Sequence, residues 1–224
     1  ARNRSVLEAG NCDFCCFTDD DEFVSSIWLE ELIRCQKEFD ADGVAGPTKP
    51  YFNKKIPSYI ENFHQPDTYE YGTIVQSAFT GCLMLRKKYL DFIEGPFDIR
   101  LDFSGGEDSF LTKKITQAGG ILRFNPYAIA FESIPDNRTT ISFIIRRSYR
   151  ISNARLYIDS FNNAGFKKRS VLPRLTMRLC NGLILLIPMM IFSKTDRFKG
   201  LIKIVNAIGG FVFIIGKKSQ FYKY

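Results

Sequence analysis

The chain has 224 residues, of which 45% are hydrophobic and 14% aromatic, so its composition excludes a disordered polymer and allows one substantial domain with an appendage. The net charge of +7 is uneven, because residues 167–224 carry 12 Lys and Arg against one acid. That basic segment is aliphatic with few aromatics, so we expect no nucleic-acid partner.

The cysteines show no paired CxxC pattern of the kind that holds zinc. We therefore expect the six cysteines to be reduced thiols of a cytoplasmic protein. The spacing Cys12-x-x-Cys15 is by itself weak evidence for a redox pair, and packing is the role that we expect for it.

The hydrophobic pattern predicts alternating short strands and helices in the first part of the chain. Helices are expected to end near residue 10 and to span 25–39, 86–93, 109–118 and 139–164. Strands are expected at 13–18, 43–46 and 78–85, with one or two more within 121–132. Residues 47–74 are rich in Pro, Asn and Tyr, which indicates a long irregular loop of functional importance.

The C-terminal tail contains two apolar runs, Leu179–Phe192 and Leu201–Ile215, flanked by lysines and arginines. Each run is shorter than the ~20 residues that a membrane-spanning helix needs. Buried core helices are one explanation and interfacial or re-entrant membrane helices are the other. The basic flanks favour a tail that lies on an anionic membrane surface.

Consecutive carboxylates follow the predicted strand at 13–18, in the run Phe17-Thr18-Asp19-Asp20-Asp21-Glu22. Such a cluster is costly unless water or a cation neutralises it, and a divalent cation bridging to a diphosphate would do so. The alternative is a solvated acidic turn that precedes the next helix.

A second acidic site, Glu107-Asp108, follows Gly105-Gly106 at the start of a predicted helix. Simple helix capping is one explanation, but capping does not require the two glycines, which allow a ligand to approach the backbone. A carboxylate here could act as a general base on a hydroxyl group. Both acidic sites fall at the ends of loops, so both can face one crevice.

The motifs together resemble those of the family-2 inverting glycosyltransferases. They are Ala1-Arg2-Asn3, the acidic run, Phe79-Thr80-Gly81, and GGEDSFLTKKITQAGG at 105–120. Within that family the chain resembles the bacterial exopolysaccharide (succinoglycan-type) sugar transferases. The resemblance implies an α/β fold, namely a partial GT-A-like mixed sheet flanked by helices. With it we expect a GT-A-like catalytic domain at 1–165 that lacks its N-terminal nucleotide-binding strands. The apolar runs and basic flanks, and not the resemblance, predict a membrane-associated helical tail at 166–224.

The resemblance also assigns roles to individual residues. Asp21 and Asp19 match the acids that contact Mg²⁺ or Mn²⁺, and Asp108 matches the catalytic base, with Glu107 orienting the acceptor. The residues that the resemblance places near the donor nucleotide-sugar are Arg2, Asn3, Asp19, Asp20, Thr80 and Gly81. Arg147 and Arg150, at helical spacing within 139–164, are further candidates that could clamp the donor diphosphate. For Arg147 and Arg150, a solvated helix face is an equally good explanation.

Two departures from the family pattern matter. Glu132 stands where the family often carries a histidine near the metal, so the third metal ligand stays open. The family's first strands, which hold the base and ribose, are absent from this sequence, so we expect an N-terminally truncated chain whose own activity is in doubt.

The expected function is transfer of a sugar, with inversion, from a nucleotide-diphospho-sugar such as a UDP-sugar to a saccharide or lipid-linked saccharide. The expected place is the cytoplasmic face of the bacterial inner membrane, in peripheral or shallow association. Two alternatives remain: a metal-dependent nucleotidyl- or phosphotransferase, and a non-catalytic membrane-bound remnant.

Overall fold

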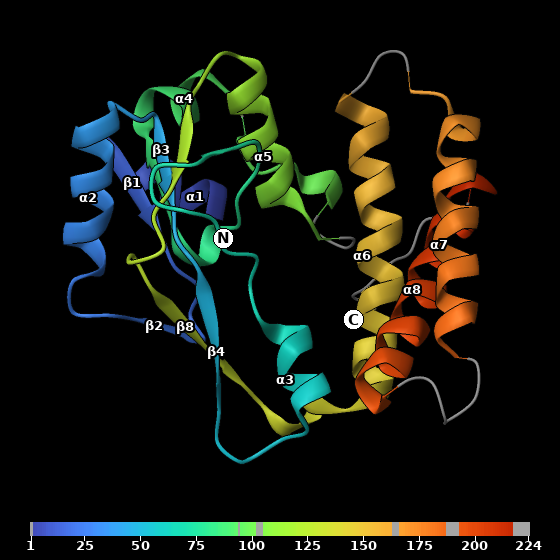
Figure 1. Cartoon of the computed structure of the whole chain (residues 1–224). Helices are drawn as coiled ribbons and strands as arrows, with labels where there is room; N and C mark the ends of the chain where they lie inside the picture. The colour runs from blue at the N-terminus through green and yellow to red at the C-terminus, as the bar shows by residue number, and fades with distance from the viewer. Residues whose placement is uncertain (1, 94, 102–104, 163–165, 187–192, 217–224) are drawn as a thin grey trace. The chain divides into compact units, whose positions relative to one another are not determined.

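The computed structural model describes residues 2–93, 95–101, 105–162, 166–186 and 193–216 (Figure 1). The chain forms two compact units. The first unit comprises residues 1–53, 64–99 and 107–134, and the second comprises 54–63, 100–106 and 135–224. The unit boundary at 134/135 differs from the predicted domain boundary at 165/166, because residues 135–162 pack with the C-terminal helices.

The first unit contains a five-stranded mixed sheet in the order β1-β6-β3-β7-β5. Its strands are β1 (Phe14–Phe17), β3 (Gly43–Ala45), β5 (Ile74–Val75), β6 (Leu83–Arg86) and β7 (Leu122–Phe124). Strands β3 and β7 run parallel, while β1 and β3 both pair antiparallel with β6. This sheet confirms the mixed α/β architecture predicted from the sequence.

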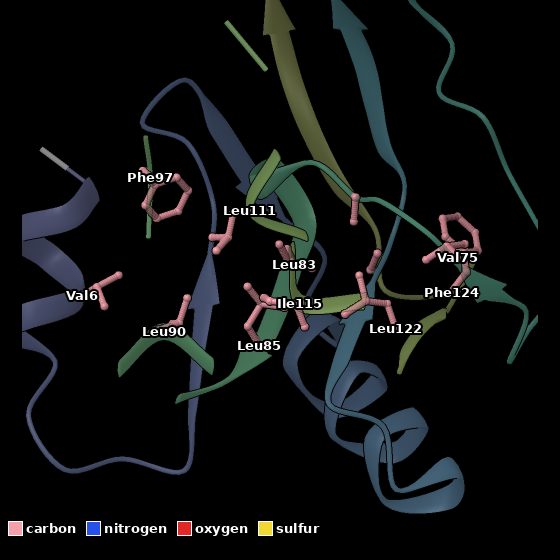
Figure 2. Packing of buried hydrophobic residues seen from close by; sticks show 12 residues of the cluster. Val6, Val75, Leu83, Leu85, Leu90, Phe97, Leu111, Ile115, Leu122 and Phe124 are labelled. Atoms are coloured by element: carbon pink, nitrogen blue, oxygen red, sulfur yellow. The ribbon is translucent and has the colours of Figure 1, made fainter. Parts of the chain in front are cut away.

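Successive side chains on a strand point to opposite faces, and both faces of this sheet are covered. Leu83 and Leu85 of β6 join one buried cluster with residues of α1 (Arg2–Glu8), α4 (Lys87–Phe92) and α5 (Glu107–Gln117), as Figure 2 shows. Met84, between them, packs in a second cluster with α2 (Trp28–Phe39). The sheet therefore lies between helices on both faces, as α/β sheets require.

A second sheet of three strands has the order β2-β8-β4. It consists of β2 (Glu22–Val24), β4 (Thr48–Phe52) and β8 (Ala130–Ile134), and β2 pairs Glu22 with Glu132. The acidic run thus leads directly into a strand rather than into the next helix. The short strand β2 was not predicted.

The segment 47–74 is more regular than predicted. It contains β4, the helix α3 (Ser58–His64) and β5, so the expectation of a long irregular loop is wrong for much of its length. The proline at position 50 is tolerated within β4, which pairs with β8. Because β4 takes part in one pairing, it is an edge strand, where proline is permitted.

The second unit is largely helical, with α6 (Ile141–Asn162), α7 (Leu172–Leu185) and α8 (Lys194–Ile214). Helix α8 packs against both α6 and α7 (Figure 1). Small residues allow this closeness: a Cβ atom at Gly209 would lie 2.3 Å from the Tyr149 carbonyl oxygen. The described residues also include short 3₁₀ helices: η1 (Thr80–Cys82), η2 (Ile99–Leu101), η3 (Asp136–Thr139) and η4 (Lys168–Val171).

The predicted helical tail is present as α7 and α8, although part of the run Leu179–Phe192 lies outside the described residues. In the part of the chain that the structure describes, no helix combines the length and apolarity needed to cross a membrane.

Candidate active site

Arg2 joins the two acidic sites of the sequence. Its guanidinium group donates to Asp19 Oδ1 at 2.6 Å and to Glu107 Oε1 at 2.5 Å. The planar fork of arginine suits this arrangement, because two nitrogens can bind two carboxylates at once. The acidic turn after β1 and the first turn of α5 are therefore parts of one site, as the sequence predicted from their positions at loop ends.

The acidic turn itself is held by Glu22. The Glu22 carboxylate accepts hydrogen bonds from the Asp19 backbone N–H at 2.8 Å and from the Thr18 hydroxyl at 3.1 Å. Burial, together with the negative charges of Asp19 and Glu132, raises the pKa of Glu22 to about 7. Glu22 is thus the structural support of the turn that presents Asp19, Asp20 and Asp21.

Gly81 makes room for this carboxylate. A Cβ atom at position 81 would lie 2.2 Å from Glu22 Oε1 and 2.9 Å from Thr48 Oγ1. A side chain at position 81 would therefore require the Glu22 carboxylate to move. The prediction that Gly81 lies beneath a donor sugar is not tested by this contact, which gives the residue a structural role as well.

Asp108 lies in the first turn of α5 and is the most perturbed carboxyl of this helix. Burial and the adjacent Glu107 charge raise the pKa of Asp108 to about 6, although the Ser109 and Thr80 backbone N–H groups and Arg2 oppose the shift. Its Oδ1 accepts the Ser109 N–H at 2.7 Å. A carboxylate with this pKa is ionised at neutral pH and is a stronger base than an ordinary aspartate.

A cavity of about 370 Å³ opens beside Arg2 between α1 and β1. Arg2, Asp19 and Thr80 are among its polar lining residues, and Val6, Phe14 and Phe17 are among its apolar ones. The Thr80 hydroxyl is buried and has no hydrogen-bond partner within the described residues. A buried hydroxyl without a partner is costly, so a ligand atom in this cavity would find an available polar group there.

The geometry can be compared with what a divalent cation needs. Within the described ranges, no group of three or more His, Cys, Asp or Glu side chains is arranged to hold a metal ion. Mg²⁺, however, is usually bound by one or two protein carboxylates, with water and substrate phosphates as the other ligands. The side chain of Asp21 is exposed and that of Asp19 is partly exposed, and both supply hard oxygen donors of that kind, so the residues present fit such a site.

The other predicted site residues lie in different settings. Asn3 uses both of its amide atoms on the backbone of Phe97, donating at 2.7 Å and accepting at 2.8 Å. Arg147 and Arg150 lie half-buried on α6 in the second unit, so their predicted contact with a diphosphate stays a prediction.

The sequence reasoning missed two features. Glu22 was read as part of the acidic cluster and not as its support, and the apolar wall formed by Val6, Phe14 and Phe17 was not foreseen. A signal for Glu22 was present, since a glutamate three residues after Asp19 can reach back to the Asp19 backbone N–H, as the glutamate of a capping box does. The cavity wall combines a helix and a strand, which no local pattern could reveal.

Comparison with known proteins gives one sequence match of note. The chain is 30% identical over 152 residues to "Succinoglycan biosynthesis protein ExoM" of Rhizobium meliloti (strain 1021), covering 67% of this chain and 49% of that protein. The chain thus spans about half the length of the curated relative that it matches. The match confirms the resemblance to succinoglycan-type proteins that the motifs indicated. No protein-family model matches the chain.

Two solved structures of S. aureus TarS residues 1–349, one in complex with UDP and one with UDP-GlcNAc, are also similar. Their identities are 13% and 14%, their TM-scores are 0.44 and 0.43, and the alignments cover 100% and 99% of this chain and 72% of each TarS chain. TM-scores below 0.5 do not establish a shared fold.

Proposed function

We propose that the first unit holds the donor site and catalytic base of an inverting sugar transferase that acts in exopolysaccharide synthesis. The observation that carries the proposal is the Arg2 bridge, which brings Asp19 and Glu107 into one site from distant parts of the sequence. The sequence similarity to a succinoglycan biosynthesis protein supports the class of polymer. The donor would be a nucleotide-diphospho-sugar, with UDP-sugars as the first candidates.

In this proposal, Asp108 is the general base. Its ionised carboxylate would take the proton of an acceptor hydroxyl as that oxygen attacks the anomeric carbon from the face opposite the leaving diphosphate. The raised pKa of Asp108 suits this task, because a stronger base accepts the proton more readily. Glu107 is held by Arg2 and would orient the acceptor beside Asp108.

The acidic turn would bind the diphosphate through Mg²⁺ or Mn²⁺, held by Asp21 and Asp19. The cation would supply charge neutralisation for the leaving diphosphate. Asp19 accepts a hydrogen bond from the Arg2 guanidinium at 2.6 Å, so Arg2 would lie close to the same phosphates. Its positive charge would add to the neutralisation of the diphosphate.

The acceptor would be a saccharide or a lipid-linked saccharide at the cytoplasmic face of a membrane. The excess of basic residues in α7, α8 and the residues that flank them supports attraction to an anionic surface. Arg147 and Arg150 remain candidates for a contact with the donor diphosphate.

The proposal is tested by isothermal titration of UDP into the chain, with and without Mn²⁺. We expect Mn²⁺-dependent binding that Asp21→Ala abolishes and that Asp67→Ala, which removes an exposed acid elsewhere, leaves intact. Binding of UDP that is the same without the cation would contradict the metal site. No binding of UDP at all would contradict the proposal that the residues of this chain suffice to bind the donor.

The products distinguish this enzyme from the alternative nucleotidyltransferase. With a UDP-sugar as substrate, sugar transfer or slow hydrolysis releases UDP, whereas nucleotidyl chemistry at the α-phosphate releases UMP or a nucleotide adduct. Chromatography of the nucleotide products after prolonged incubation with Mn²⁺ separates the two reactions. Release of UMP would overturn the transferase assignment.

A further inference from the structure

The segment between α1 and β1 brings two thiols into contact. Cys12 Sγ and Cys15 Sγ lie 3.8 Å apart. Cys15 is half-buried against the hydrophobic cluster of the sheet, whereas Cys12 is exposed. Packing, the role expected from the sequence, therefore explains Cys15 but not Cys12.

The backbone fixes this contact from both sides. Gly10 adopts a left-handed conformation with φ +61, which turns the chain after α1 toward β1. Cys15 pairs with Leu85 across the sheet. Asp13, which lies between the two cysteines in the sequence, accepts a hydrogen bond from the Lys87 N–H at its carbonyl oxygen at 2.8 Å. A disulfide has an S–S distance of about 2.05 Å, so the two sulfurs, which lie 3.8 Å apart, would approach by less than about 2 Å when the bond forms.

The other cysteines are placed differently. Cys16 follows Cys15 on β1 and leaves the strand on its opposite face, so it does not share the contact between Cys12 and Cys15 although it also lines the cavity. Cys35 and Cys82 are buried in the cluster beneath α2, and Cys180 is an exposed thiol of the second unit.

We propose that Cys12 and Cys15 form a modification site that closes to an intramolecular disulfide on reaction with a low-molecular-weight disulfide such as oxidised glutathione. The proposal does not depend on the function proposed above. It assigns to this pair a reversible covalent state that changes the wall of the cavity shared with Arg2 and Asp19, because both cysteines line that cavity.

The chemistry is thiol–disulfide exchange in two steps. The Cys12 thiolate attacks one sulfur of the small disulfide, whose S–S bond breaks, and a mixed disulfide forms while one thiolate leaves. Cys15 then loses its proton to the thiolate released in the first step, attacks the Cys12 sulfur and expels the second thiolate. The two cysteines lose two electrons, the small disulfide gains them, and the two protons of the cysteines end on the released thiols.

The electrostatics support the order of these steps. Burial and the hydrogen bond with Cys12 raise the pKa of Cys15 to about 11, and the nearby charge of Lys87 opposes this shift. Cys15 is therefore protonated at neutral pH and does not attack first. The exposed Cys12 is the sulfur that a small disulfide reaches.

The test is equilibration of the whole chain in buffers of reduced and oxidised glutathione, followed by alkylation of free thiols and peptide mass spectrometry. We expect Cys12 and Cys15 to lose reactivity together and to appear in one peptide that lacks two hydrogens. Cys180 should form only a mixed disulfide, which reports that the oxidant is active. A lasting glutathione adduct on Cys12 beside an alkylated Cys15, or a link between Cys12 and Cys16, would overturn the proposal.

Substitutions provide matched controls. Cys12→Ser removes an exposed thiol, so the variant should fold normally and show no internal disulfide under any buffer. Cys16→Ser is the neighbouring control and should retain the internal disulfide. If Cys12→Ser still loses the Cys15 thiol to an internal link, the pairing is wrong.

Discussion

At the level of single residues, one arginine balances several acids. Arg2 contacts Asp19 and Glu107 directly. Burial opposes the charged form of Arg2, but the negative charges of Asp19, Glu107 and Asp108 outweigh it and raise the pKa of the Arg2 guanidinium. One positive charge cannot neutralise three carboxylates, so part of the negative charge stays uncompensated. That surplus is what a cation, or the proton of an acceptor, would relieve.

The raised pKa of Asp108 predicts a stability effect of Asp108→Asn. In the folded state the Asp108 carboxyl keeps its proton up to about pH 6, whereas in the unfolded chain it releases the proton near pH 4. The free energy of unfolding therefore falls as the pH rises between these two values. The full difference corresponds to at most about 3 kcal/mol, and partial exposure reduces it to about 1–2 kcal/mol. We expect Asp108→Asn to raise the free energy of unfolding by that amount at pH 8 and hardly at all at pH 4.

Urea unfolding at both pH values checks this expectation. Asp67→Asn serves as the control, because Asp67 is exposed and the substitution should be nearly neutral. A gain that is equal at pH 4 and pH 8 would show that the effect does not come from the charge of Asp108. The same variant should lose sugar-transfer activity, because an amide cannot accept the proton.

At the level of elements, the site depends on the close approach of η1 to β2. Gly81 in η1 lies against the Glu22 side chain in β2 and the Thr48 hydroxyl in β4, so the two sheets of the first unit meet at a position without a side chain. The carboxylate of Glu22 in turn holds the backbone N–H of Asp19. A side chain at position 81 would therefore act on the acidic turn through Glu22.

This chain of contacts predicts the effect of Gly81→Ala. Overpacking at a close contact usually costs about 1–3 kcal/mol, and we expect Gly81→Ala to reduce the free energy of unfolding within that range. In the Glu22→Ala background the closest contact is absent, so the same substitution should cost clearly less. Denaturant unfolding of the four chains gives the interaction free energy, and strict additivity would contradict direct contact.

At the level of the whole molecule, charge and apolar surface are segregated along the sequence. Residues 167–224 carry 12 basic residues and one acid. Met177, Leu183 and Ile184 of α7 are more than half exposed, at 62%, 52% and 51%. Basic residues beside exposed apolar side chains are the combination that interfacial membrane helices use.

This distribution predicts binding to anionic vesicles. The double variant Lys167→Glu with Arg169→Glu changes two exposed residues next to α7 and should weaken partition by at least about tenfold, because each basic residue near an anionic surface contributes about 1 kcal/mol. Cosedimentation with phosphatidylserine-containing vesicles at low and high salt measures the effect.

The matched control is Lys37→Glu with Lys55→Glu, which makes the same change of net charge at exposed positions far from α7 in the sequence. Equal loss in both double variants would mean that net charge alone governs partition. Unchanged partition in the first variant would count against electrostatic docking by this region.

Regular elements with a strong hydrophobic period were predictable from the sequence. The strand β1, the helix α2 and the helix α5 all lie within a few residues of their expected ranges, because each shows its pattern locally. The strands β2 and β4 were missed, since a three-residue strand and a proline-containing edge strand carry almost no periodic signal. Their structure depends on pairing with β8, a distant segment.

The sequence by itself determined the α/β class, the two acidic sites and the resemblance to succinoglycan-type proteins, because these depend on the identity and local spacing of residues. Only the tertiary structure decided that Arg2 ties Asp19 to Glu107, that Glu22 fits against Gly81, and that Cys12 touches Cys15 beside the same cavity. The physical reason is that these contacts depend on how strands pair and how helices pack on them. Distances between side chains from different elements are fixed by that packing, and no local pattern records them.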